Sequence, residues 1–217
     1  MSVAVFAAEV VPFERPPIDW HAVAPELVLL GFGALVTTLD AVFLERGRRF
    51  TAPIAGLALL ATLIPIITLA VDGAASEPRV ALGEAYVVDG YSLILKALFV
   101  LVGYVVVLMS TNYIAEGDYW ESEYYGLLLS SIMGMVVMAS ARDLITVFVA
   151  LELLSIPAYL MATWRKRDLR SNEAGVKYYL NGVFASALML YGMSLLFGVS
   201  GSTILRDINA AVDGPGS

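Results

Sequence analysis

The chain contains no cysteine and a single histidine, His21, among its 217 residues. Without cysteine it can hold neither a disulfide nor a cysteine-ligated zinc or iron–sulfur site of its own, and one histidine cannot supply a histidine pair to a haem. It also lacks the glycine-rich loop typical of dinucleotide binding and any basic patch typical of nucleic-acid binding. We therefore expect no cofactor, no metal and no nucleic acid on this chain, and any linked redox chemistry must take place elsewhere.

Charged residues are also scarce. They make up 15% of the chain, whereas 59% of the residues are hydrophobic. Soluble domains usually have about a quarter of their residues charged and about 45–50% apolar. The few charges cluster between long apolar runs, and runs of roughly 20 residues are long enough to cross a bilayer as helices. The composition predicts a polytopic membrane protein that is surrounded by lipid.

Six apolar runs are expected to cross the membrane as helices. They lie at 25–44, 53–71, 91–111, 124–140, 144–160 and 174–197. The predicted fold class is therefore all-α, with six transmembrane helices. The organisation that we predict is an extramembrane N-terminal segment at 1–24, three helices within 25–111, three more within 124–198, and a polar loop or tail at 199–217.

The basic residues indicate how the helices are oriented. The segment ERGRRF follows the first run and WRKRDLRSNEAG follows the fifth, so both connections lie on the same side of the membrane. Lys and Arg are enriched in cytoplasmic loops. We therefore expect these connections in the cytoplasm, and the N-terminus and the acidic loop at 72–89 outside.

The fifth run, LITVFVALELLSIPAYL, carries one carboxylate, Glu152, near its centre. An ionised acid at mid-depth costs at least about 2.5–3.5 kcal/mol on insertion scales, so such residues are rare and usually functional. Pro157 lies five residues later and is expected to kink the helix. The residues predict a functional buried acid; the alternative is an acid that pairs with a neighbouring helix for structure alone.

Lys177 lies in the sixth run and is the candidate partner of Glu152. Glu152 and Lys177 lie on consecutive antiparallel helices, so they could pair directly or through a water molecule. Such a pair would couple their titrations, as in proton relays. Asn181 extends the same polar stripe inward. The alternative is that the Lys177 ammonium reaches back to the membrane interface.

Lys96 and Asp40 are the other charged residues inside the runs. Lys96 lies about five residues into the third run and is expected to extend to the outer interface. Asp40 lies near the cytoplasmic end of the first run, where Arg46 or Arg48 could neutralise it. Both are possible site residues, with a structural role favoured.

These residues resemble the antiporter-like membrane subunits of respiratory complex I, the bacterial type I NADH:quinone oxidoreductase, and among them the subunit N group. The resemblance runs from Pro25 onward and is most specific between Glu123 and Thr203. The motifs that carry it are Pro25-Glu26, Val88-Asp89-Gly90 with Lys96, Glu152-Leu-Leu-Ser155 with Pro157 and Tyr159, Glu173-Ala174, Lys177-Tyr178-Tyr179 and Gly201-Ser202-Thr203.

The resemblance implies a role in proton translocation that is driven by quinone reduction elsewhere in the complex. Glu152 corresponds to the acid of the family's fifth helix, and Lys177 to a lysine of its sixth. NADH, FMN, iron–sulfur clusters and quinone are implied on other parts of the complex. The implied partners are its other membrane subunits, and the implied location is the bacterial inner membrane.

The family pattern also differs from this chain. Family members are more than twice as long and have fourteen helices, partly built from inverted repeats. The resemblance therefore implies that these six helices, which lack the buried lysines of later helices, are either the N-terminal portion of a longer subunit, which we favour, or a truncated product that cannot pump alone. Arg142 stands where relatives usually carry a small polar residue. Two other functions stay open, a subunit of a multisubunit sodium/proton antiporter and a structural scaffold.

Overall fold

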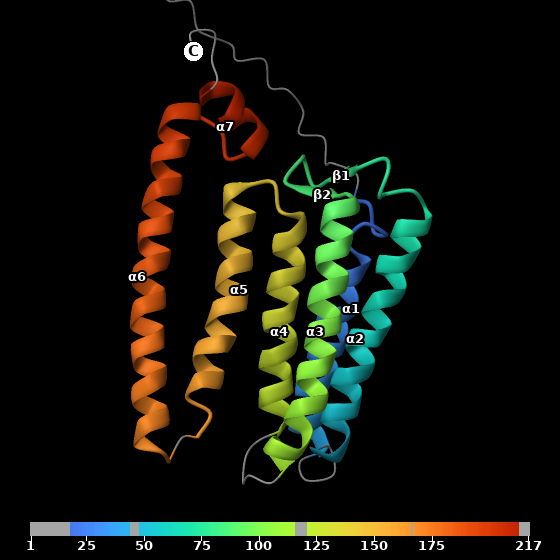
Figure 1. Ribbon diagram of the computed structural model, residues 1–217, viewed down its shortest axis with the longest axis vertical. Coiled ribbons are helices and arrows are strands. Elements are labelled where there is room, and N and C mark those ends of the chain that lie inside the picture. Colours follow the sequence, from blue (N-terminus) through green and yellow to red (C-terminus); the bar gives the residue numbers. More distant parts are fainter. Residues whose placement is uncertain (1–17, 44–47, 116–120, 166, 213–217) are drawn as a thin grey trace, which may run out of the picture.

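The computed structural model is a bundle of long helices with a small hairpin and a short helix at one end (Figure 1). It describes residues 18–43, 48–115, 121–165 and 167–212. The elements in chain order are α1 (Ala24–Phe43), α2 (Arg48–Val71), β1 (Arg79–Ala81), β2 (Tyr86–Val88), α3 (Gly90–Ala115), α4 (Glu121–Ser140), α5 (Leu144–Ala162), α6 (Leu169–Ser200) and α7 (Leu205–Val212). The N-terminal segment predicted at 1–24 lies mostly outside the described residues.

The long helices confirm the prediction of an all-α polytopic membrane protein. Within the described part, the five helices α2 to α6 are long and apolar enough to cross a membrane. Helix α1 has 20 residues, or about 30 Å at 1.5 Å per residue, but its apolar stretch, Ala24–Leu39, is shorter. The count of six spans is therefore approximate.

Helices α1 to α4 share one apolar core, and α5 and α6 are added to it in sequence. Helix α4 contacts α1, α2, α3 and α5, whereas α6 packs mainly against α5 and α7. Large side chains such as Leu29, Leu59, Ile132 and Val136 are fully buried in the core. In α6, which the structure describes completely, Gly175 is the one buried residue. Figure 1 accordingly shows α6 at the edge of the bundle.

Helices α4 and α5 approach each other most closely at Gly134. A Cβ atom on this residue would lie 2.6 Å from the Leu154 backbone nitrogen and 2.8 Å from the Ala150 carbonyl oxygen. One turn away, the Ser131 hydroxyl donates a hydrogen bond of 3.1 Å to the Leu154 carbonyl. That carbonyl lies in the turn that Pro157 weakens, because proline cannot donate a backbone hydrogen bond.

The acidic loop predicted at 72–89 contains a β-hairpin. Strands β1 and β2 pair antiparallel, and Tyr86 and Val88 of β2 are buried. The Arg142 backbone nitrogen donates to the Ala85 carbonyl at 2.8 Å, and the Arg142 side chain pairs with Asp89 at 2.9 Å. The hairpin is thereby attached to the connection between α4 and α5. Apolar burial within an otherwise polar loop explains why composition alone did not predict it.

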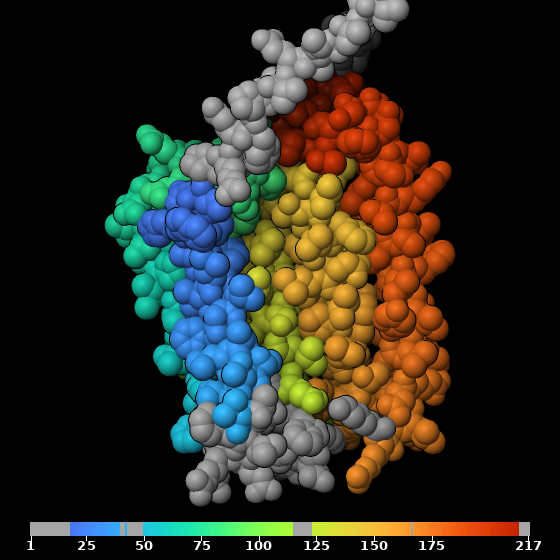
Figure 2. Space-filling view, turned by 180° about the vertical axis from the view of Figure 1, so that it is seen from behind, coloured from blue at the N-terminus to red at the C-terminus, as the bar shows by residue number. Residues whose placement is uncertain are grey.

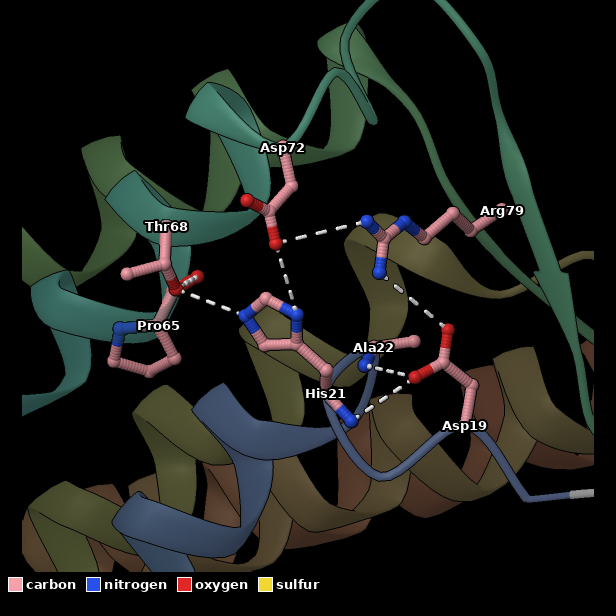
Figure 3. A network of polar contacts seen from close by, with 7 residues as sticks. All are labelled: Asp19, His21, Ala22, Pro65, Thr68, Asp72 and Arg79. Atoms are coloured by element: carbon pink, nitrogen blue, oxygen red, sulfur yellow. Dashed lines mark hydrogen bonds and ion pairs between the residues drawn. The ribbon is translucent and has the colours of Figure 1, made fainter.

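A polar network at the same end ties the start of α1 to the end of α2 and to β1 (Figure 3). The His21 ring nitrogens lie 2.9 Å from the Thr68 hydroxyl and 3.4 Å from an Asp72 carboxylate oxygen. Arg79 lies 3.8 Å from Asp72 and 3.7 Å from Asp19. The single histidine therefore belongs to this network between elements.

The segment predicted as a polar loop or tail contains the short helix α7. Helix α6 ends at Gly201, whose φ of 69° is the left-handed conformation that glycine adopts readily. The chain then returns to the start of α5, where the Leu144 backbone nitrogen donates to the Thr203 carbonyl at 2.9 Å. Arg206 of α7 pairs with Glu84 of the hairpin at 2.7 Å. These contacts join the hairpin end of the α5–α6 pair to the rest of the fold.

We predict that Gly134→Ala destabilises the α4–α5 contact by about 1–3 kcal/mol, because the added methyl group meets backbone atoms that cannot rotate away. The measurement is thermal unfolding of the purified chain in detergent. Gly192→Ala in α6 is the matched control, since a Cβ there has nothing within 4 Å. An equal loss of stability in both variants would contradict the close contact at Gly134.

Candidate functional site

Glu152 lies near the middle of α5 and faces α6. Its Oε1 atom accepts a hydrogen bond of 2.5 Å from the Ser186 hydroxyl of α6, and the residue is half-buried. Eight residues separate it from Leu144, which places it about 12 Å along the helix axis from that end. The structure therefore holds the acid at mid-depth between two helices, with a hydroxyl as its hydrogen-bond partner.

Asp143 positions the helix that carries Glu152. It is the N-cap of α5, and its carboxylate accepts hydrogen bonds from the Thr146 backbone nitrogen at 2.9 Å and the Thr146 hydroxyl at 3.2 Å. Burial raises the pKa of Asp143, but hydrogen bonds from Thr203, Thr146 and Ile145 together outweigh it and hold the pKa below its usual value. The cap is therefore an ionised carboxylate at neutral pH.

The structure does not bring Glu152 and Lys177 together. The register of α5 against α6 places Ser171 beside Ala162, where its hydroxyl donates at 3.0 Å, and Ser186 beside Glu152. Lys177 precedes Ser186 by nine residues and so lies about 13 Å along the axis from the level of Glu152. It pairs with Glu173, one turn earlier, at 2.5 Å.

Lys177 and Glu173 are both largely exposed, with 70% and 64% of their side chains accessible. An exposed pair of this kind contributes about 0–1 kcal/mol, so it holds the lysine only weakly. Tyr159 of α5 packs edge-on against Tyr178 and Tyr179 at this level. An aromatic cluster therefore lies near the level of Lys177, where a direct partner on α5 was expected.

Lys96 is buried, contrary to the prediction that it extends to the outer interface. Its side chain is 0% exposed, and its Nζ atom lies 3.0 Å from Glu26 Oε1 of α1. The same ammonium donates a hydrogen bond of 2.6 Å to the Tyr86 hydroxyl oxygen. Two acceptors inside the bundle thus replace water, which is why extension toward the interface is not needed.

Tyr86 of the hairpin completes this cluster. Its hydroxyl donates a hydrogen bond to Glu26 Oε1, the oxygen that also faces Lys96. Burial raises the pKa of Tyr86 strongly, and the Glu26 charge raises it further, so the phenol keeps its proton. We call Glu26, Tyr86 and Lys96 the hairpin-end triad. It joins α1, β2 and α3.

Two members of the hairpin-end triad were missed as site residues. Glu26 entered the sequence analysis only through the Pro25-Glu26 motif, and Tyr86 was not singled out. A usable signal existed: the first and third runs start on the same side of the membrane, and each carries a charge of opposite sign within about two turns of its start. Pairing them removes the cost of burying each alone.

The remaining possible site residue, Asp40, lies in α1, but its side chain is outside the described part of the structure. The opposite face of the molecule carries a groove between α1 and α4 that Leu160 of α5 helps to line (Figure 2). Its volume is about 510 Å³, and its lining is mainly aliphatic, with Glu123 among the exceptions. Among the described residues, no three His, Asp or Glu side chains lie close enough to hold a metal ion.

Comparison with known proteins gives consistent matches. Residues 141–215 match a family described as the transmembrane part of NADH:quinone oxidoreductase and Mrp antiporters. The chain is 34% identical to NADH-quinone oxidoreductase subunit N of Thioalkalivibrio sulfidiphilus, over 91% of this chain and 40% of that protein. It is 36% identical to subunit N of Brevibacillus brevis, over 88% of this chain and 38% of that protein.

Solved structures agree with these relatives. A chain of respiratory complex I from Thermus thermophilus, determined with bound aureothin, matches with a TM-score of 0.68 and 31% identity, over 89% of this chain and 39% of that chain. A chain of an archaeal membrane-bound sulfane sulfur reductase matches with a TM-score of 0.75 at 18% identity, over 86% of this chain and 39% of that chain, and shares the fold. The chain spans about two-fifths of the length of the relatives that it matches.

We predict that Asp143→Ala destabilises the chain by about 0.5–2 kcal/mol at neutral pH through loss of the α5 cap. Because the folded pKa of Asp143 is depressed, its contribution is present above the unfolded value of about 3.9 and is lost as the pH falls through the folded value. Thermal unfolding of both proteins across this range measures the difference.

The control for this prediction is Asp168→Ala. Asp168 is the N-cap of α6 but is exposed and accepts from the Arg170 backbone nitrogen at 3.0 Å. Its loss should lie at the low end of the same range. A stability difference between the native chain and Asp143→Ala that stays constant below pH 4 would contradict the role of the Asp143 charge.

Proposed function

We propose that this chain, which belongs to the antiporter-like membrane subunits that include NADH-quinone oxidoreductase subunit N, takes part in proton translocation in such a complex. Its own contribution is a buried acid that binds and releases protons within the membrane. The redox reaction, with NADH, FMN, iron–sulfur clusters and quinone, takes place on other subunits. The chain thus acts as part of a translocase.

The observation that carries the proposal is the place of Glu152 in the fold. It lies near the middle of an apolar helix, and it accepts a hydrogen bond from Ser186. A carboxylate held only by a hydroxyl can take up a proton and keep its hydrogen bond, because a hydroxyl both donates and accepts. A carboxylate that is paired with a fixed cation would not have this freedom. Glu152 is therefore suited to transfer a proton.

Lys177 acts on Glu152 through its charge at a distance. At about 13 Å and an effective dielectric constant of 20, two unit charges interact by about 1 kcal/mol. The partner Glu173 largely cancels this interaction while the pair is closed. Because that pair is exposed and weak, a swing of the ammonium away from Glu173 would change the field at Glu152. Lys177 thereby modulates proton binding without touching the acid.

The proposed setting follows from the charges of the connections. The chain is a multi-pass membrane protein, and we place it in the bacterial inner membrane, where its partners are the other membrane subunits of the complex. The basic connections after α1 and α5 then face the cytoplasm. The hairpin and α7 lie at the other end of the bundle (Figure 1) and face outward.

A second function is a subunit of a multisubunit sodium/proton antiporter. The matching family includes Mrp antiporters as well as NADH:quinone oxidoreductase. Both would use Glu152 as a proton-binding acid. The neighbouring genes separate the two: genes for NADH dehydrogenase subunits support the first function, and genes for antiporter subunits support the second.

We predict that Glu152→Gln in the complete complex lowers proton pumping at least tenfold, because the amide keeps the size and the hydrogen bond to Ser186 but cannot take up a proton. Pumping is measured as acidification of inverted membrane vesicles during NADH oxidation, with quinone reduction followed in parallel. Glu77→Gln is the matched control, since Glu77 is an exposed carboxylate of the hairpin-end loop.

Unchanged pumping and unchanged quinone reduction in Glu152→Gln would contradict the proposal. Lys177→Met tests the modulating role, and a several-fold loss of pumping with normal assembly is expected. If the two single variants, Lys177→Met and Glu152→Gln, both pump at the native rate, the result would support the remaining alternative, a scaffold whose charges serve helix packing.

A further inference from the structure

The hairpin-end triad has no role in the function proposed above, although it contains Lys96, the most deeply buried charge that the structure describes. Lys96 is 0% exposed and Glu26 is 7% exposed. Burying an ion in a protein interior costs several kcal/mol per ion even after relaxation. A salt bridge of 3.0 Å offsets this cost, but a pair of apolar residues would often be as stable or more so. Stability alone therefore does not explain these charges.

The geometry of the triad forms a continuous hydrogen-bonded path. The Lys96 ammonium donates to the Tyr86 hydroxyl oxygen at 2.6 Å, and the Tyr86 hydroxyl donates to Glu26 Oε1. Lys96 and Glu26 are also in direct contact at 3.0 Å. A proton can thus move from nitrogen to carboxylate directly or through the phenol, whose own proton is replaced as it leaves.

One acceptor of the triad is left open. Glu26 Oε2 is buried and has no hydrogen-bond partner within the described ranges. Buried polar atoms without a partner are rare, and they leave a group strained, hydrated or reactive. The open oxygen is where a proton can be bound or given up.

The charges around the triad come from four elements. Glu26 lies on α1, Lys96 on α3 and Tyr86 on β2. The negative charge of Asp89, at the start of α3, also attracts the Lys96 ammonium. Asp89 is itself paired with Arg142, which follows α4, at 2.9 Å. The Ser140 hydroxyl at the end of α4 interacts with Tyr86. The two ion pairs balance, so the triad changes its net charge only by gaining or losing a proton.

We propose that Glu26, Tyr86 and Lys96 form a second proton-exchange site, at the hairpin end of the bundle, in addition to the acid Glu152. This inference rests on the proposed function. The Glu152 site lies at mid-depth, and the triad lies toward the outward end. The Glu152 site and the hairpin-end triad therefore supply proton-binding groups at two depths of the same helix bundle.

The proton steps balance without any further reactant. An N–H bond of the Lys96 ammonium breaks and an O–H bond forms on Glu26, which leaves a neutral amine and a carboxylic acid. The neutral carboxyl group then rotates about its Cγ–Cδ bond, which turns the protonated oxygen into the open position, and it releases this proton to water at the hairpin end. The amine takes up a new proton that arrives from inside the bundle, which restores the ion pair. One proton passes in each cycle.

The test uses the double variant Glu26→Gln with Lys96→Met in the complete complex. Removing both charges avoids the unpaired ion that a single substitution would leave, so assembly is expected to persist. We expect quinone reduction to continue and proton pumping to fall at least fivefold. A second variant, Tyr86→Phe, keeps the ion pair and removes only the phenol from the path, and should lower pumping two- to fivefold.

The matched control is Glu84→Gln with Arg206→Gln. This pair also anchors the hairpin end, because it joins the hairpin to α7 at 2.7 Å. If the triad serves only as an anchor, the control should lower pumping as much as the triad variants do. We expect it to pump at close to the native rate once assembled.

Infrared difference spectra of the working complex supply an independent readout. The proposal expects a protonated-carboxyl band that appears during turnover and is absent in Glu26→Gln. Native pumping in Tyr86→Phe and no such band would overturn the proposal even if the double variant fails to assemble. Native pumping in the double variant, with pumping lost in Glu152→Gln, would overturn this site and leave the proposed function standing.

Discussion

The cost of placing ionised groups where water is absent governs most of this structure. Two charged side chains inside the bundle, Lys96 and Glu152, have different kinds of partner. Lys96 lies between a carboxylate and a phenol and is fully buried. Glu152 accepts a hydrogen bond from the Ser186 hydroxyl. The first arrangement joins three elements through an ion pair, and the second joins two helices through one neutral hydrogen-bond donor.

The hairpin explains how elements far apart in the chain meet at one end. Tyr86 reaches α1 and α3 through the triad, and the adjacent Ala85 accepts from the Arg142 backbone. Arg142 also pairs with Asp89 at the start of α3. Glu84 contacts α7 through Arg206. One short loop therefore connects the α1–α4 core to the start of α5 and to α7, which follows α6.

Helix positions could be predicted because their signal is local. The run predicted at 144–160 lies within α5 (Leu144–Ala162), and the run predicted at 91–111 lies within α3 (Gly90–Ala115). The agreement arises because an apolar run must be about as long as the hydrocarbon core is thick. The β-hairpin and α7 were missed because each depends on packing that composition does not encode. Lys96 was placed at the interface because a lysine near a helix end extends outward unless a buried partner holds it.

The sequence by itself determined the membrane setting and the all-α fold, and it singled out Glu152 as a candidate site residue, because apolar run length and the cost of a buried acid need no knowledge of neighbours. Tertiary structure alone decided the partners. The register of α5 against α6 set Ser186 beside Glu152 and left Lys177 about 13 Å away along the axis. The fold of the hairpin brought Tyr86 to Glu26 and Lys96. Contacts between distant segments depend on how helices stack, which no local pattern records.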